Sequence, residues 1–502
     1  MYIYKVIKTF YMRFVRGSAR FQQSFLSLDD RIGQDNVVRV IDEVCNSFIV
    51  SGLCLVDKGK KMTGRKAYHP GDLLKLFVYG YFNGVSSSRK LERECLRNIE
   101  LQWLMEGLAP DHKTISDFRK NNPDLIRGLF LFLTRSFKEQ GLATGRCIAV
   151  DGTKIKAYAY KEYRLDHLKK KLENIENQAA KYMEDLAAID EAEDSVEELE
   201  TRKQKLTEEL EELERKKKAY SGVVNELESE GLKRKCTTDP DARTMKARYG
   251  TFLGYNLQIA VDVDSHFVTE YQLVNGQNDK GLLAPMVEGS AEVMGQKPEE
   301  VQADAGYYKK KEVETLEEEG VECFVAVNDT TSRIQDEING LKFIYNSGED
   351  NYQCSGGRTL DYYRKKTENG EEKRIYKSKD CSGCPFLNVC TKPGSHPRTR
   401  TYTRNSNQEW LDRYKEKMMS EKGKKKLRQR KAVAEHPFGT MKYYMGQMPT
   451  VLRGRKNVSS EMGLYTIAYN LKRYMAILGQ NSRQNPAVLA KSCSSFILLF
   501  NN

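Results

Sequence analysis

The sequence predicts an α/β fold, in which a mixed β-sheet follows an all-helical N-terminal region and is interrupted by two insertions. Apolar residues recur at three- and four-residue spacing up to about residue 140, which is typical of amphipathic helices. From residue 146 the pattern changes to short apolar strands that alternate with helical segments, which favours a layered α/β architecture. A heptad-like stretch and a cysteine-rich stretch fit neither pattern, so we interpret them as insertions.

Residues 1–140 are expected to form a small basic helical domain. Apolar side chains at helical spacing mark its clearest helix, and they are Leu73, Leu74, Phe77, Val78 and Tyr81. Asp111 stands just before a second helical pattern, where an aspartate serves as an N-cap. Two roles are open for this domain: DNA binding, with Arg119 as a candidate contact, and dimerisation or packing.

The first part of the α/β core is expected in residues 141–160 and 236–330. "RCIAVDG" is predicted to be a short apolar strand that ends in Asp151. "YNLQIAVDVDSHFVTEYQLV", residues 255–274, has the alternation of a β-hairpin with a polar turn near its middle.

The rest of that core alternates helices and strands. A helix is expected at about residues 279–294, followed by the strand "EEVQADAG" with Asp304 at its end. The helix "YKKKEVETLEEEG" then leads to the strand "VECFVAV". This order of elements predicts a sheet with mixed strand directions.

The first insertion, residues 161–235, is expected to form an antiparallel helical hairpin. Its apolar residues alternate spacings of four and three on both sides of the polar break "DEAEDS", and they are Leu168, Leu172, Ile175, Ala179, Tyr182, Leu186 and Ile189, then Val196, Leu199, Leu206, Leu210 and Leu213. Each arm would be about 35–40 Å long at ~1.5 Å per residue. The charged faces are either simply solvated or used in dimer contacts or to embrace DNA.

The second insertion, residues 331–405, is rich in cysteine. Four thiols, one close pair of them in a C-x2-C spacing, suit tetrahedral Zn²⁺, and they are Cys354, Cys381, Cys384 and Cys390. His396 is an alternative ligand, and ordinary reduced cysteines are the alternative to a metal site. A zinc here would be structural, because the insertion has few apolar residues.

The charge of the chain is uneven. The net charge is +12, and residues 161–230 hold 13 basic and 21 acidic side chains, so the remainder carries +20. Residues 406–480 are expected to form basic helices followed by a tail at 481–502, and the window 411–460 alone has 14 Lys or Arg against 4 Asp or Glu. Such a balance predicts a polyanionic partner, of which double-stranded DNA is the obvious one.

The N-terminal stretch "MYIYKVIKTFYMRFVRG" interrupts its apolar residues with basic ones and has no cleavage site, so no signal peptide is predicted. Met12 is an alternative start. No apolar run of about 18 residues occurs, so no membrane span is expected. Eleven cysteines without a secretory signal favour reduced thiols in a cytoplasm.

Three carboxylates have the setting of a divalent-cation site. Asp151 and Asp304 each end an apolar strand and are followed closely by glycine, and in open α/β sheets sites form outside such strand ends. Glu435 is an isolated acid within the basic C-terminal stretch "KAVAEHPFGTMKYY". Two Mg²⁺ ions (or Mn²⁺) bound by such oxygens activate a water or 3′-hydroxyl and stabilise the leaving oxygen. The alternatives are strand-end caps for the aspartates and an incidental ion pair for Glu435.

Several motifs resemble those of a known family. "IAVDGTKIKA", "TTDPDARTMK", "GYNLQIAVD", "VQADAGY", "EHPFGTMK" and "AYNLKR" are similar to the bacterial DDE transposases of the insertion sequence 1182 family, within the broader insertion sequence 4 group. The N-terminal "YHP" and "HKTISDFR" stretches resemble the same family, so nearly the whole chain is covered.

The resemblance implies a ribonuclease-H-like core that cuts element ends and joins them to target DNA with Mg²⁺. It assigns Asp151 as the first acid, Asp304 as the second and Glu435 as the third. It also implies binding to terminal inverted repeats, a homodimer or higher multimer that brings two ends together, and action on nucleoid DNA in a bacterial cytoplasm.

The wider group carries a Tyr, Arg, Glu, Lys signature on its last helix. By resemblance Arg430 and Lys442 are the basic members, and Lys442 shares a helix face with Glu435 because they are seven residues apart. The tyrosine position holds Leu427, and Pro437 predicts a kink or break beside the site. Neighbouring candidate DNA contacts are Arg428 and Lys431, and the alternative for all of these basic residues is a solvated face.

Two other functions are compatible with the pattern: a nuclease or resolvase with the same core, and a catalytically inactive DNA-binding regulator. The presence of all three acids speaks against the regulator. No phosphate-binding loop of the G-x-x-x-x-G-K-[ST] kind occurs, so ATP hydrolysis is not expected. Asp239 and Asp241 are interpreted as turn formers, and Trp410 as a core residue or a base-stacking platform.

Overall fold

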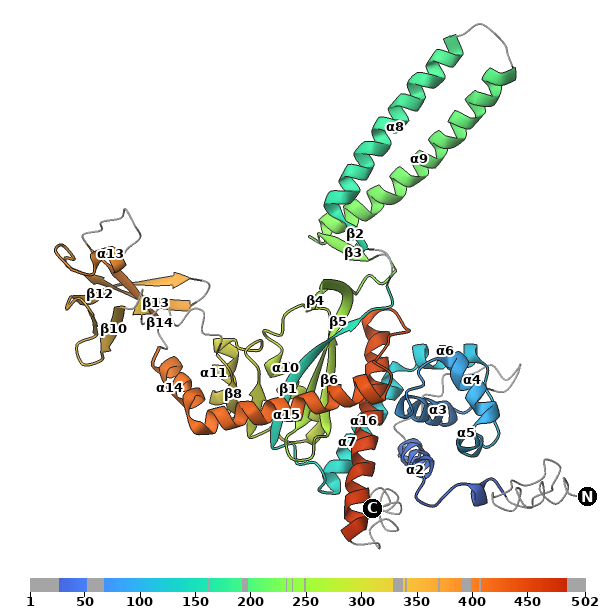
Figure 1. The fold of residues 1–502 in the computed structure, drawn as a ribbon, viewed down its shortest axis with the longest axis horizontal. Helices are drawn as coiled ribbons and strands as arrows, with labels where there is room; N and C mark the ends of the chain where they lie inside the picture. The colour runs from blue at the N-terminus through green and yellow to red at the C-terminus, as the bar shows by residue number, and fades with distance from the viewer. Residues whose placement is uncertain are drawn as a thin grey trace, which may run out of the picture.

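The computed structural model describes residues 27–51, 67–159, 162–191, 197–231, 233–236, 238–247, 250–327, 337–338, 341–368, 371–390, 399–405 and 408–484 of the chain. Met12, the alternative start, and His396, the alternative zinc ligand, lie outside these residues. Figure 1 shows a central α/β body with the N-terminal helices on one side, a smaller sheet on the other, and a long helical hairpin that projects from it.

The N-terminal region is helical. Its elements are a 3-10 turn η1 (Asp29–Arg31), α2 (Val37–Val50), α3 (Pro70–Phe82), α4 (Ser88–Arg97), α5 (Ile99–Leu104), α6 (His112–Asn121) and α7 (Pro123–Glu139). The apolar stripe predicted on α3 is buried, with Leu74, Phe77 and Tyr81 fully inside. Asp111 is the N-cap of α6 and accepts a 2.8 Å hydrogen bond from the Thr114 backbone N–H, which confirms that prediction.

The central sheet mixes antiparallel and parallel pairs. Its strands are β1 (Cys147–Lys156), β4 (Arg243–Ala247), β5 (Gly250–Asp262), β6 (Val268–Val274), β7 (Glu300–Ala303) and β8 (Glu322–Val325). The order across the sheet is β4-β5-β1-β7-β8, and β6 pairs with the same edge of β5 as β4, farther along the strand. β1 is antiparallel to β5 and parallel to β7, and β7 is parallel to β8. Antiparallel pairing therefore joins β4, β5, β6 and β1, and β7 and β8 extend the sheet from β1 by parallel pairing.

β1 is longer than the sequence predicted. Asp151 was expected at the end of a strand, but β1 continues to Lys156 because the long strand β5 pairs with it from Asp262 to Gly254. On the opposite edge, pairing with β7 stops at Ala149. Asp151 therefore lies just beyond the end of the parallel ladder while its other edge is still held in the sheet.

Helices cover both faces of the sheet. They are α10 (Leu283–Met294), α11 (Lys310–Glu318), α14 (Gln408–Met419), α15 (Glu421–Tyr444) and α16 (Arg455–Gln484). α15 packs across β1, β5, β7 and β8, and α16 packs against β6, α3 and α7, so the C-terminal helices tie the N-terminal region to the sheet (Figure 1). None of the helices in the described part of the chain is long and apolar enough to cross a membrane.

Residues alternate between two cores along β1. Ala149 belongs to the same core as Val433 and Phe438 of α15, whereas Val150 belongs to the core on the other face. Since side chains alternate along a strand, Asp151 is on the face of Ala149 and therefore beneath α15.

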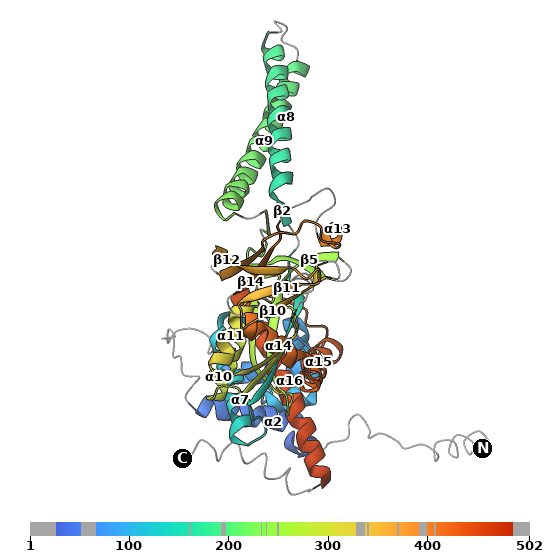
Figure 2. The same cartoon turned by 90° about the vertical axis from the view of Figure 1, so that its left-hand side faces the viewer.

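The helical hairpin is α8 (Leu165–Glu191) and α9 (Glu197–Ser229), joined at its base by the short strands β2 (Glu162–Arg164) and β3 (Arg234–Cys236). Leu168, Val224 and Leu227 form a small buried cluster near that base. Figures 1 and 2 both show the arms extending away from the central body.

The smaller sheet is antiparallel throughout. Its strands are β9 (Glu337–Ile338), β10 (Leu341–Asn346), β11 (Asn351–Cys354), β12 (Thr359–Glu368), β13 (Glu371–Ser378) and β14 (Thr401–Asn405), with a short helix α13 (Leu387–Cys390) beside them. Its core is mostly aromatic, with Tyr352 and Tyr376 buried at its centre. The cysteine-rich segment therefore has a folded core of its own.

Candidate active site

Asp151 and Asp304 come together through the register of two neighbouring parallel strands. The ladder between β1 and β7 pairs Cys147 with Glu300 and Ala149 with Gln302, an offset of 153 residues. The same offset continued by two residues places Asp304 beside Asp151 (151 + 153 = 304). Adjacent strands are about 4.8 Å apart, so the two carboxylates belong to one local site.

Asp151 is largely buried beside other acids, and both conditions raise the pKa of its carboxyl group. Only 17% of its side chain is exposed, and burial raises its pKa to about 6. The charges of Asp304 and Asp279 raise the pKa further, while Arg430 and the Gly152 backbone N–H, which donates a 2.9 Å hydrogen bond, oppose them. Arg430 and the Gly152 N–H therefore stabilise the charged form of Asp151, while burial and the neighbouring acids destabilise it.

Asp279 is a third carboxylate at this site, and the sequence analysis missed it. Its Oδ1 accepts hydrogen bonds from Asn256 Nδ2 at 2.7 Å and Gln258 Nε2 at 2.8 Å, both on β5. The Tyr307 hydroxyl in turn bonds the Gln258 side-chain oxygen and fixes that amide. A polar "GQND" stretch directly after the β6 strand was the available signal, but we expected a helix to start at Asp279.

Two glycines let these groups approach one another. A Cβ on Gly152 would lie 2.4 Å from Gln258 Nε2, so a side chain there would displace the amide that holds Asp279. A Cβ on Gly306 would lie 2.9 Å from Asp304 Oδ1 and 3.3 Å from Asp279 Oδ2. The glycines after both strand-end acids therefore serve close packing at the carboxylates.

Helix α15 brings two cations to the site. Arg430 Nη1 is 3.5 Å from Asp151 Oδ1, and Lys442 Nζ donates a 2.7 Å hydrogen bond to Thr153 Oγ1, two residues farther along β1. Arg430 Nη1 is buried and makes no hydrogen bond in the described part of the chain. Of the kink or break expected at Pro437, the break is wrong, because α15 is one continuous helix through that residue, and Pro437 is buried within it.

Glu435 lies on α15 between these two contacts, and its side chain is exposed. Its position along the helix brings it to the level of Asp151 and Thr153, and it shares a helix face with Lys442. Among the residues that the structure describes, however, no group of three or more His, Cys, Asp or Glu side chains is placed to hold a metal ion. Asp151 and Asp304 are close enough for their charges to interact. Glu435 lies on the helix that packs over β1, but it does not form a metal-binding cluster with these two acids in the described residues.

Arg119 is not a DNA contact, which corrects the sequence prediction. It is 2% exposed, and its Nη1 donates to the Tyr81 hydroxyl at 2.9 Å and to the Ser86 carbonyl at 2.8 Å. Glu461 of α16 lies 3.5 Å from the same nitrogen. Arg119 instead joins the N-terminal helices to α16 through a buried ion pair.

Arg428 and Lys431, the other candidate contacts on α15, are exposed. Arg428 Nε donates a long 3.4 Å hydrogen bond to the Lys424 carbonyl within the helix. Leu427, at the position of the family's tyrosine, packs against the core formed with α10 and α11. The basic face of α15 is thus open to a polyanion on the side away from that core.

The four cysteines of the smaller sheet converge. Their thiols line one small cavity of about 30 Å³, and they are Cys354, Cys381, Cys384 and Cys390. Burial raises the pKa of Cys390, the nearby thiols add to this, and Arg400 opposes it. A Cβ on Gly356 would lie 2.7 Å from Cys384 Sγ and 3.6 Å from Cys354 Sγ, so a glycine allows these thiols to share the space.

Three secondary predictions have definite outcomes. Asp239 is fully buried and accepts hydrogen bonds from the Tyr255 hydroxyl at 2.7 Å and the Gly454 N–H at 3.1 Å, so it anchors the start of α16 rather than only forming a turn. Asp241 does the same through the Arg455 N–H at 2.8 Å. Trp410 stacks on a tyrosine at 5.0 Å in the core, which favours its packing role.

Comparison with known proteins gives two family matches. The family described as "Transposase domain (DUF772)" matches residues 26–121, and the family described as "Transposase DDE domain" matches residues 353–475. No curated protein matches the chain significantly.

One solved structure is similar in part: a cryo-electron microscopy structure of the piggyBac transposase synaptic complex with hairpin DNA. It is 11% identical, the similarity covers 91% of this chain and 78% of that one, and the TM-score is 0.33. So low a TM-score supports no conclusion about this chain.

Proposed function

The two matched families indicate a DDE transposase, a protein of DNA transposition, and on that premise we propose that Asp151, Asp304 and Glu435 are its catalytic acids. The observation that carries this proposal is the position of Asp151 just beyond the end of the β1–β7 ladder, where the charge of Asp304 acts on it, beneath a helix that supplies Arg430 and Lys442. We infer that the sheet is a ribonuclease-H-like core, and the antiparallel strands β1, β5 and β6, followed by the parallel strands β7 and β8, support this.

The donor set at this site fits divalent cations. Neighbouring carboxylates repel one another, and the raised pKa of Asp151 reflects burial beside two other acids. Oxygen ligands of this kind are those that Mg²⁺ and Mn²⁺ take in phosphoryl-transfer sites. When bound, two such ions would supply an activated water or 3′-hydroxyl and stabilisation of the leaving oxygen. Asp151 and Asp304 would hold them, with Glu435 turned toward β1.

The other side chains of the site would position the DNA. Lys442 and Arg430 offer their cationic groups on either side of Glu435, and Arg430, whose Nη1 lies 3.5 Å from Asp151 without a hydrogen bond, would bind a phosphate oxygen held beside that carboxylate. Asp279 would act through its neighbours, because its Oδ1 is already committed to two amides while its Oδ2 faces Asp304. It is a positioning residue in this proposal.

The substrates we propose are the terminal inverted repeats of the element and a target duplex. The two ends would be brought together by a homodimer or higher multimer, acting on nucleoid DNA in a bacterial cytoplasm. Cleavage followed by joining distinguishes this activity from that of a simple nuclease.

Incubation of end-labelled repeats, both intact and pre-cleaved, with a target plasmid and Mg²⁺ tests the proposal. Joined products that disappear in Asp304→Asn are expected. If the repeats are nicked but never joined, the chain is a nuclease and not a transposase. If the DNA is bound and neither nicked nor joined, the regulator interpretation replaces ours.

We also propose that the four cysteines of the smaller sheet bind a structural Zn²⁺. Thiolates are the preferred zinc ligands, and four of them around one small cavity with a C-x2-C pair make the required donor set. The metal would draw the thiols closer, because in the described residues no three of them are yet arranged as ligands. A zinc content near one per chain that is lost in Cys384→Ser would support this site, and an unchanged content would exclude it.

A further inference from the structure

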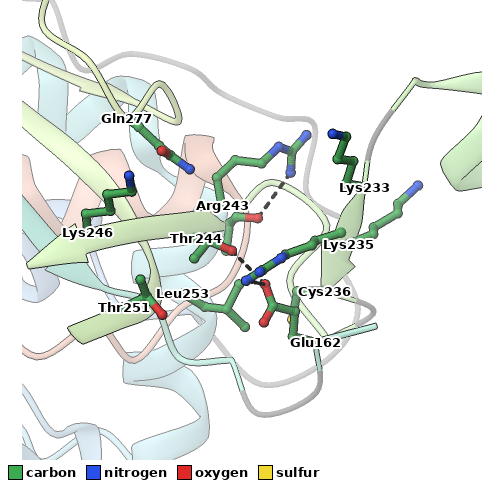
Figure 3. A pocket seen from close by; sticks show the side chains of 12 residues that line it. Glu162, Lys233, Lys235, Cys236, Arg243, Thr244, Lys246, Thr251, Leu253 and Gln277 are labelled. Atoms are coloured by element: carbon green, nitrogen blue, oxygen red, sulfur yellow. Dashed lines mark hydrogen bonds and ion pairs between the residues drawn. The ribbon is translucent and has the colours of Figure 1, made fainter. Parts of the chain in front are cut away.

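Two cavities follow one another along the edge strand β4. The first, of about 660 Å³, begins beside the candidate active site and includes Lys154, Lys156 and Lys442 in its lining. The second, of about 330 Å³, lies between β4 and the base of the helical hairpin (Figure 3). Thr251 lines both cavities, so they adjoin at this residue of β5. We call the two adjoining cavities the β4 groove.

The β4 groove is connected to the site by Lys442. Its Nζ donates to Thr153, which is two residues from Asp151 on β1 and on the same face of the strand. Farther along, Lys154 Nζ donates a 3.0 Å hydrogen bond to the Lys246 carbonyl and so bridges β1 to β4. Cationic side chains therefore lie at intervals between Thr153, near the carboxylates, and Lys246 in the second cavity.

The far end of the groove carries uncompensated positive charge. Lys233, Arg243 and Lys246 line it, and in the described part of the chain none of the three has a carboxylate within ion-pair distance. In the view of Figure 3 their head groups all point to the same side of the pocket. Arg243 Nη1 donates only to the backbone carbonyls of Pro240 and Ala242, which leaves its charge unbalanced.

The remaining charges of this pocket are already paired. Glu162 accepts a 2.6 Å hydrogen bond from Thr244 Oγ1 and lies 3.8 Å from Arg234. Lys235 bonds Glu226 and Glu230 of the hairpin, and in Figure 3 it points away from the pocket. The acids near the base thus neutralise Arg234 and Lys235 and leave the groove itself cationic.

We infer that the β4 groove binds the phosphate backbone of a DNA duplex and leads it from the carboxylates to the base of the helical hairpin. Cationic side chains without partners repel one another, and phosphates spaced along a backbone relieve that repulsion. The inference rests on the proposed function, since it places the DNA on which that function acts.

The arms of the hairpin are excluded from this path. Residues 161–230 carry 13 basic and 21 acidic side chains, so they repel a polyanion. The sequence left open an embrace of DNA by the arms. The charge distribution instead favours contact at the base, where β2, β3 and β4 meet, with the arms directed away from the duplex.

Fluorescence anisotropy with a labelled 30-base-pair duplex of arbitrary sequence tests the inference on the full chain. Lys233→Ala/Arg243→Ala/Lys246→Ala is expected to weaken binding about 10- to 100-fold at ~0.1 M salt and to lower the slope of log Kd against log salt by about 2.7, at ~0.9 per lost phosphate contact. The matched control removes three exposed hairpin lysines, as Lys170→Ala/Lys205→Ala/Lys218→Ala, and is expected to change neither quantity.

Arg243 also holds backbone carbonyls, so its loss can destabilise the fold. The double variant Lys233→Ala/Lys246→Ala avoids this, because both side chains are exposed, and it is expected to lower the slope by about 1.8. Slopes equal to wild type in both groove variants, or an equal loss in the hairpin control, would overturn the inference. Asp151→Asn separates the two proposals: cleavage by that variant at the wild-type rate contradicts the catalytic proposal and leaves the binding result standing.

Discussion

The carboxylates proposed as catalytic in the central sheet and the cysteine cluster of the smaller sheet are both sets of side chains of the kinds that bind metals, and the chain brings them together differently. The acids Asp151 and Glu435 are 284 residues apart in the sequence (435 − 151), whereas Cys354 and Cys390 are 36 apart (390 − 354). The first set exists only when β1, β7 and α15 have all packed together. The second is made within one small antiparallel sheet. Damage to the first should therefore appear as lost chemistry, and damage to the second as lost local stability.

The carboxylate set and the cysteine set each contain an acidic group with a raised pKa. Burial raises the pKa of Asp151 and of Cys390, and neighbouring acids or thiols raise each further. One arginine opposes the shift in each case, Arg430 for the aspartate and Arg400 for the thiol. In both sites the anionic form of the side chain therefore carries a free-energy cost that a bound cation would offset.

Asp151→Asn is the change with the largest expected effect. It removes the charge at the centre of the carboxylate site and leaves its shape, so Mg²⁺-dependent cleavage is expected to fall by about 10³-fold or more, which corresponds to several kcal/mol of transition-state stabilisation. Single-turnover cleavage of a labelled repeat measures it. The binding of DNA should be retained, and cleavage within tenfold of wild type would contradict the role of Asp151.

Asp279→Asn should have a smaller effect on the same reaction. Its carboxylate acts through neighbouring groups, and loss of such a partner typically costs about 10- to 100-fold in metal affinity or activity. Titration of Mg²⁺ during cleavage separates the possibilities, since a positioning role predicts a higher Mg²⁺ requirement with partial recovery at saturating metal. A loss as large as that of Asp151→Asn, with no recovery, would make Asp279 a direct ligand.

Cys384→Ser should affect the smaller sheet and spare the central one. If zinc holds the cluster, loss of one thiolate removes metal-binding free energy that contributes to folding. Limited proteolysis is expected to cut within residues 341–405 several-fold faster in the variant, and metal chelation of the wild type should reproduce this. Equal protease resistance of variant, chelated and untreated protein would show that the aromatic core is sufficient.

Glu43→Gln is expected to have the smallest effect, a pH-dependent change in the free energy of unfolding. Glu43 contrasts with both sites because it is a half-buried acid that is not part of a candidate metal site. Burial raises the pKa of Glu43 to about 7, Asp42 adds to this, and its Oε1 has no hydrogen-bond partner in the described residues. Because the pKa of Glu43 is higher in the folded chain than in the unfolded chain, its protonation stabilises the fold. This contribution to the free energy of unfolding is fully present below the unfolded-state pKa of about 4.3 and is lost as the pH rises toward 7.

Between pH 4 and pH 8 wild type should therefore lose about 1–2 kcal/mol relative to Glu43→Gln, a value reduced from the full shift because the side chain is partly solvated. Urea unfolding at the two pH values measures the difference. A difference independent of pH would mean that Glu43 titrates normally in the folded chain.

The sequence predicted those parts of the candidate site that local sequence patterns determine. Asp151 follows the apolar residues of β1 and Asp304 follows β7, and the register of these two parallel strands brings them near one another, which a strand pattern can suggest. Asp279 was missed because it lies in a loop, and only the amides of β5 bring it to the other two. The length of β1 was wrong because pairing with a distant strand, rather than its own residues, extends it.

The prediction for Arg119 failed for a related reason. A basic residue on a short polar helix looks like a surface contact, but its partner Glu461 is 342 residues away (461 − 119) and only packing with α16 reveals it. The same limit applies to Pro437, which tertiary packing holds inside a continuous helix. Long-range packing, not local propensity, decided both cases.

The most direct test of the catalytic assignment is cleavage of a labelled duplex that carries the element's own terminal repeat, with Mg²⁺, by wild type and by Glu435→Gln. This change keeps the shape of the side chain and removes its charge. We expect wild type to nick at the repeat boundary and the variant to bind the duplex without cutting it. Equal cutting by both would contradict the account, because Glu435 would then be an incidental exposed acid on α15.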